Sequence, residues 1–193
     1  MTLYRVVLFL HILTLLVAAG VTAVTKLAVA RRGRARTLGD ALEWHNTLLA
    51  AARIFPLCLV AFVVTGGYMM SVLHVSVLHT GFILAGLAAV LLLLTSGTYL
   101  GVRGAGLKKA FEGMIAANGA DAPVPRMTPP PLVTVLPVVN TGIALAAAFD
   151  MVLKPISVPV ALGILAGGAV LGAIAAPRAP AAARTQAAAA PQS

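Results

Sequence analysis

The sequence has few charged, acidic and aromatic residues. Only 10% of its 193 residues are charged and 5% are aromatic, and acidic residues number 5. A soluble globular domain carries about 25% charged residues, so this composition excludes that class. With 60% hydrophobic residues, the chain is also too apolar for its bulk to be intrinsically disordered.

Common catalytic motifs are absent as well. The sequence contains no glycine-rich phosphate loop, no HExxH zinc motif and no GxSxG nucleophile motif. The only cysteine, Cys58, cannot form a disulfide within the chain and is interpreted as a small buried apolar residue. These absences argue against an enzyme of the soluble type and favour a protein without enzymatic activity of its own.

Long apolar runs are what the sequence does contain. A helix needs about 20 apolar residues to cross a hydrocarbon core ~30 Å thick, and helices satisfy their own backbone groups in lipid. The runs therefore predict an all-α polytopic transmembrane bundle with five spans, a four-helix core plus one C-terminal span. Residues 1–176 form the expected transmembrane domain, and the Ala/Pro-rich residues 177–193 are expected to be a disordered cytoplasmic tail. The predicted spans are residues 6–25, 54–75, 79–100, 132–153 and 156–176.

Basic residues fall unevenly on the two sides that five spans define. The net charge is +9, and all but two of the 14 basic residues lie on the side of the first loop, the third loop and the C-terminus. The exceptions are Arg5 and Lys154. Because cytoplasmic loops carry the excess of Lys and Arg, we place the N-terminus outside and the C-terminus inside a cell membrane, the inner or plasma membrane. A cleaved signal peptide ending at Val21-Thr22-Ala23 is the alternative for the first span.

The same basic loops suggest partners. They are expected to meet anionic lipid headgroups of the bilayer. Nucleic acid is not expected, because no aromatic residues interleave the basic run. Glycines four residues apart allow helices to approach closely in lipid, within one chain or between subunits of a homo- or hetero-oligomer. These glycine pairs are Gly97/Gly101, Gly163/Gly167 and Gly168/Gly172.

Two further helical segments are expected outside the spans. Thr37 can cap a helix in the first loop, and Pro56 would bend its junction with the second span. Trp44 suits the headgroup level. The apolar stripe of this helix is Leu38, Leu42, His45, Leu49 and Ala52. A second helical face follows the third span and ends at Asn118-Gly119; it comprises Leu107, Phe111, Met114 and Ile115.

Ionisable residues at membrane depth are the candidates for function. His11 lies roughly 8 Å inside the first span, too deep to reach water, so it needs a partner from another helix. Asp150 lies at a similar depth and is the expected polar contact of His11. Lys154 follows Asp150 at the i,i+4 spacing of a helix ion pair. His11 and His79 are the candidate cofactor ligands, because two imidazoles at their depths could bind a tilted haem from both sides.

Three short motifs follow one another along the sequence: Leu10-His11-Ile12-Leu13, Thr65-Gly66-Gly67-Tyr68 and Phe149-Asp150-Met151-Val152-Leu153-Lys154-Pro155. Their order resembles that of a known group. The group comprises bacterial four-helix integral membrane proteins of uncharacterised role, similar to the copper-resistance D proteins and to the membrane-bound protoporphyrinogen oxidase. The resemblance covers about residues 5–155 and implies a four-helix bundle with His11 facing inward. That oxidase uses a membrane lysine, and the second and third spans here contain none.

Three functional hypotheses follow. The first is a small multi-pass membrane protein that binds a ligand or partner within the bilayer. The second is a haem-linked or redox membrane protein that uses His11. The third is a protein that handles copper or another metal at the outer face. The residues that would serve this third role are Met69, Met70, His74 and His79.

Overall fold

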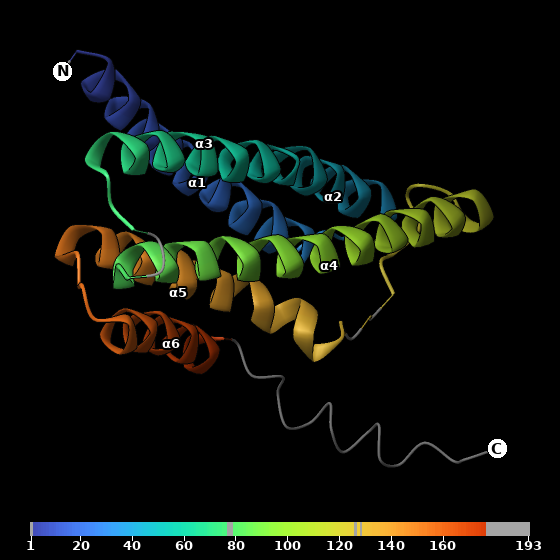
Figure 1. Cartoon of the computed structure of the whole chain (residues 1–193). Helices are drawn as coiled ribbons and strands as arrows, with labels where there is room; N and C mark the ends of the chain where they lie inside the picture. Colours follow the sequence, from blue (N-terminus) through green and yellow to red (C-terminus); the bar gives the residue numbers. More distant parts are fainter. Residues whose placement is uncertain (1, 77–78, 126, 128, 177–193) are drawn as a thin grey trace.

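All regular elements of the described chain are helices (Figure 1). The computed structural model describes residues 2–76, 79–125, 127 and 129–176. Five stretches in this part are long and apolar enough to cross a membrane, with α2 and α3 counted together. The predicted all-α class with five candidate spans is confirmed, and the chain is a multi-pass membrane protein by helix length and composition. The helices are α1 Thr2–Arg32, α2 Leu38–Ala52, α3 Ile54–Leu73, α4 Gly81–Asn118, α5 Pro131–Leu153 and α6 Val158–Ala175.

Two helices extend well past the predicted spans. α1 has 31 residues and continues to Arg32. α4 has 38 residues, so the predicted third span and the helical face after it form one continuous rod. No proline interrupts this segment, and its four interior glycines between residues 97 and 106 each weaken a helix by only about 1 kcal/mol. α4 ends at Asn118, at the predicted Asn118-Gly119 stop, and Gly119 has a φ of +86°. The predicted tail, residues 177–193, lies outside the described residues.

α2 follows the sequence prediction closely. It begins after Thr37, whose hydroxyl accepts a hydrogen bond from the Asp40 backbone N–H at 3.2 Å. It ends at Ala52, and Arg53 separates it from α3. Pro56 explains this break, because proline has no N–H to donate to the carbonyl of Ala52 four residues earlier. The segment after α4 supplies hydrogen-bond acceptors for the first N–H groups of α2. The Leu38 and Gly39 N–H groups donate to the carbonyls of Ala122 and Ala120, each at 2.9 Å.

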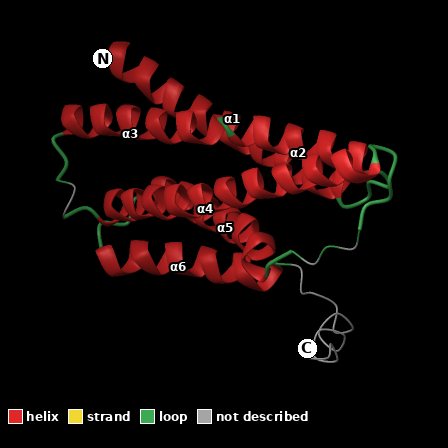
Figure 2. Cartoon of the chain, turned by 90° about the vertical axis from the view of Figure 1, so that its right-hand side faces the viewer, coloured by secondary structure: helices red, strands yellow, loops and turns green. Residues whose placement is uncertain are grey.

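The helices form two units that join at one end. α1 packs along α2 and α3, whereas α5 packs along α6 and α4. The two units meet mainly where α2 lies against α4, and α3 touches α4 at few positions. Figure 2 shows this order, with α1 and α3 on one side, α6 on the other, and α4 and α5 between them. α6 lies along both α4 and α5, so the C-terminal span is part of the packing rather than an addition outside a core.

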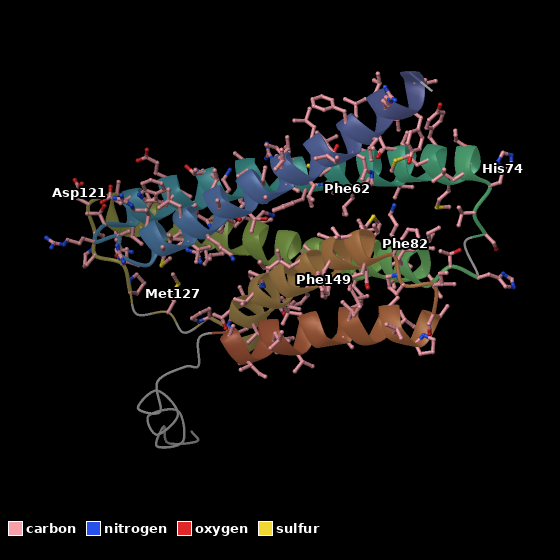
Figure 3. All side chains as sticks on the ribbon, turned by 90° about the vertical axis from the view of Figure 1, so that its left-hand side faces the viewer. Phe62, His74, Phe82, Asp121, Met127 and Phe149 are labelled. Atoms are coloured by element: carbon pink, nitrogen blue, oxygen red, sulfur yellow. The ribbon has the colours of Figure 1, made fainter. Side chains whose placement is uncertain are left out.

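Two buried clusters hold the helices together, one within the α4–α6 unit and one where the two units meet. The cluster in the α4–α6 unit comprises Ala89, Ile143, Ala146 and Leu165. At the junction of α2 with α4, Leu38 and Ala41 pack against Phe111, with residues 122 and 124 beside them. We call this second region, formed by α2, the last turns of α4 and residues 119–124, the cap. His74 and the cap residue Asp121 lie at opposite ends of the molecule (Figure 3).

Candidate functional site

His11 lies on the narrow stripe by which α1 packs against the rest of the protein. The less exposed residues of α1 recur at spacings of three and four. This stripe faces α3, because α1 packs along α3 in this part of the chain. The ring of His11 meets Phe62 of α3 edge to face, with centroids 5.1 Å apart and planes at 76°. The members of the stripe are Tyr4, Val7, His11, Thr14, Ala18 and Val21.

The partner of His11 is Thr65, a residue of the second motif singled out in the sequence. The Nδ1 atom of His11 lies 2.7 Å from Thr65 Oγ1. The Thr65 hydroxyl donates its only hydrogen to the carbonyl of Ala61, at 2.6 Å. Its oxygen must therefore accept from His11, so Nδ1 carries the ring hydrogen and Nε2 is an unprotonated acceptor.

The Nε2 atom of His11 is left with an unused lone pair. It has no hydrogen-bond partner among the described residues, and it is not enclosed by them. Gly66 lies beside this part of the ring, since a Cβ built there would be 3.8 Å from His11 Cε1. A polar atom left without a partner in hydrocarbon costs free energy. His11 thus retains an unsatisfied capacity to accept a hydrogen bond or to bind a metal ion.

Asp150 lies in the other unit. Its side chain is fully buried, and neither carboxylate oxygen has a hydrogen-bond partner in the described part of the chain. It follows Gly142 and Ala146 at four-residue spacing, and both of these contact α6. His11 is hydrogen-bonded to Thr65, and the Asp150 carboxylate has no hydrogen-bond partner among the described residues. The structure therefore does not bring these two predicted partners together. Their similar predicted depth did not place them side by side, because α1 packs along α3, whereas α5 packs along α4 and α6.

The other two predicted site residues are also apart from His11. Lys154 ends α5 in a left-handed conformation, with φ 49° and ψ 51°. This conformation turns its side chain out of the i,i+4 register, so Lys154 shares only a backbone hydrogen bond with Asp150, at 2.7 Å. His79 is exposed between α3 and α4, and its Nδ1 lies 3.2 Å from Ser76 Oγ. The described residues contain no group of three or more His, Cys, Asp or Glu side chains that could hold a metal ion.

Sequence reasoning missed the linking role of His45 in the cap. Its Nδ1 lies 2.8 Å from Arg32 Nη1 of α1, and its Nε2 lies 2.8 Å from the Gly104 carbonyl of α4. Arginine only donates and a carbonyl only accepts, so His45 is the neutral tautomer with hydrogen on Nε2. It is buried beside Phe111 and joins three helices. Its place on the apolar stripe of the predicted helix was the available signal, since a polar residue there must find partners.

Comparisons with known proteins identify no relative. The chain matches no known protein family, and neither a curated protein nor a solved structure shows significant similarity to it. The resemblance of its three short motifs to a four-helix membrane group therefore stays an expectation. The function proposed below therefore depends on the geometry around His11 alone.

Proposed function

We propose that this protein binds a ligand within the bilayer through His11, without enzymatic activity of its own. The observation that carries the proposal is the hydrogen-bond chain from His11 through Thr65 to Ala61. These two hydrogen bonds fix the His11 ring and its tautomer and leave its Nε2 atom free. Histidines that bind metal ions commonly donate their other ring N–H to a fixed acceptor in this way.

The surroundings of His11 favour a ligand that arrives through the lipid. α1 and α3 bury few of their side chains within the protein. α3 touches α4 at few positions, so the two units leave the membrane portion of α1 and α3 largely uncovered. A ligand here needs an apolar body and one group that interacts with an imidazole lone pair. That group is either a hydrogen-bond donor or a metal centre.

Haem is the second candidate, and the free nitrogen of His11 favours it. His79 is exposed and bonded to Ser76, so the described residues offer a single imidazole at this place. His11 would hold the iron as the one protein ligand, with Thr65 fixing the ring. When bound, haem would supply redox chemistry. Phe62 contacts the ring edge to face and would limit its rotation.

The first prediction concerns ligand retention by His11. His11→Gln should abolish the binding of a metal centre, because an amide offers no imidazole nitrogen. It should weaken the binding of a hydrogen-bond donor, because Thr65 does not hold the amide oxygen in the place of Nε2. Thr65→Val should weaken binding by about 10–100-fold, the usual effect of removing the group that orients a ligating histidine. The measurements are native mass spectrometry of the detergent-purified protein and a titration with haemin followed at the Soret band.

The matched control is His74→Gln, which changes an exposed histidine at the end of α3. It should retain the wild-type mass adduct and the wild-type Soret titration. A wild-type protein with no adduct and no haemin binding would contradict the proposal. Equal binding by His11→Gln and His74→Gln would contradict it too.

The second prediction concerns orientation. We propose that residues 1–176 form a transmembrane domain with the N-terminus outside and the cap in the cytoplasm. The Gly39 N–H donates to the Ala120 carbonyl at 2.9 Å, so the first and third loops lie at the same end. Reporter fusions at Gly39 and Gly119 should therefore read cytoplasmic, because these loops hold most of the basic residues. A fusion at Ser76 should read exterior, and a cytoplasmic signal there would refute the orientation.

A further inference from the structure

The junction of α1 with α2 holds a basic hollow at the edge of the cap, and the function proposed for His11 does not use it. It has a volume of about 320 Å³ and is lined by Arg31, Arg34, Ala35, Arg36, Asp40 and Trp44. Three of these six residues are arginines with exposed side chains. We infer that this hollow binds the phosphate group of an anionic phospholipid, an inference independent of any ligand at His11.

The arginines of the hollow are free to bind an anion. The described residues contain one salt bridge, between Lys108 and Glu112, so no arginine here is paired with a carboxylate. Arg32, their neighbour in sequence, differs because its guanidinium is hydrogen-bonded to His45. Guanidinium groups donate two parallel hydrogen bonds to phosphate oxygens, and three of them around one hollow favour a phosphate over a single carboxylate.

Hydrogen bonds fix the backbone that carries the arginines before any ligand arrives. The Arg34 N–H donates to the Arg31 carbonyl at 3.0 Å in the turn that ends α1. The Arg36 carbonyl accepts from the Val124 N–H at 3.2 Å, which ties the turn to the cap. The Arg31 guanidinium lies 5.8 Å from the centroid of the Trp44 ring. A fixed site loses less conformational entropy on binding than a flexible basic loop.

The position of the hollow identifies its occupant as a lipid. Leu27 and Val29 of α1 are exposed apolar side chains that suit contact with lipid, and Arg31 follows within one turn. Trp44 lies at the same level, and tryptophan is enriched where headgroups meet the hydrocarbon. Basic pockets at such a level bind anionic lipid headgroups. Asp40 also lines the hollow, so its carboxylate must weaken the attraction.

Trp44 gives a direct measurement, since it is the only tryptophan of the chain. The full-length protein is placed in phosphatidylcholine nanodiscs that contain a fixed fraction of brominated phosphatidylglycerol or brominated phosphatidylcholine. Bromine on the acyl chains quenches tryptophan nearby. The anionic lipid should quench Trp44 several-fold more than the zwitterionic lipid. An Arg34→Gln, Arg36→Gln double variant should lose this preference, because each arginine removed weakens the affinity for an anionic lipid by about fivefold.

The control is Arg103→Gln. Arg103 is also exposed and lies over an aromatic ring, 5.5 Å from the centroid of Tyr99, but it is outside the hollow. This variant should keep the lipid preference, and Asp40→Asn should increase it. Equal quenching by the two lipids would overturn the inference, as would a preference that survives the double variant. Loss of the preference on adding inorganic phosphate at constant ionic strength would assign the hollow to free phosphate and overturn the lipid as occupant.

Discussion

Gly168→Ala is expected to lower the free energy of unfolding by about 3 kcal/mol, because α5 and α6 are in backbone contact at this glycine. A Cβ at Gly168 would lie 2.5 Å from the carbonyl oxygen of Gly142 and 2.5 Å from the Cβ of Ala146. Neither atom belongs to a flexible side chain, so the two helices would have to separate. Thermal unfolding of the detergent-purified protein measures the loss.

The neighbouring glycine provides a control of opposite sign. A Cβ at Gly167 would meet nothing within 4 Å. Alanine is a better helix former than glycine by about 1 kcal/mol, so Gly167→Ala should raise the melting temperature slightly. Equal melting temperatures for the two variants would show that α5 and α6 do not pack through Gly168.

His45→Ala is expected to cost about 3–5 kcal/mol of stability. The change leaves the Arg32 guanidinium and the Gly104 carbonyl without their partner in a partly buried place, and each such loss costs about 1–3 kcal/mol. It also removes the ring that packs beside Phe111. The helices α1, α2 and α4 would lose their shared contact, which a shift of the thermal unfolding curve would detect.

Asn46→Ala is the matched control, because Asn46 is exposed on the next position of α2. It should leave the unfolding curve within about 0.5 kcal/mol of the wild type. His45→Gln separates packing from hydrogen bonding, since an amide can replace one ring nitrogen at most. A curve for His45→Ala as close to the wild type as that of Asn46→Ala would contradict the linking role of His45.

Local signals in the sequence were sufficient to predict the helices. Apolar runs of about 20 residues located the spans, and Thr37 and Pro56 located the start and the end of α2. These features act within one or two turns of a helix, so they do not depend on the rest of the fold. The end of α4 before Gly119 belongs to the same category, because glycine adopts the positive φ found there without steric cost.

The partners of each helix could not be predicted in the same way. Lipid and neighbouring helices both accept apolar side chains, so hydrophobicity does not reveal which face packs. Of the three glycine pairs in the sequence, only Gly168 and Gly172 meet another helix within 4 Å. His11 was assigned a carboxylate partner by depth, whereas the structure gives it Thr65. Depth along the membrane normal leaves the order of the helices around the bundle undetermined.

The contact of the two helical units at one end makes the cap a fulcrum. His11 lies 21 residues before Arg32 along a single helix, which is a lever arm of about 32 Å. A rotation of α1 and α3 together by about 10° about the cap would therefore displace His11 by about 5 Å relative to the α4–α6 unit. Few contacts between α3 and α4 oppose such a rotation. The cap, at the far end of the molecule, would thus set the distance between His11 and the α4–α6 unit.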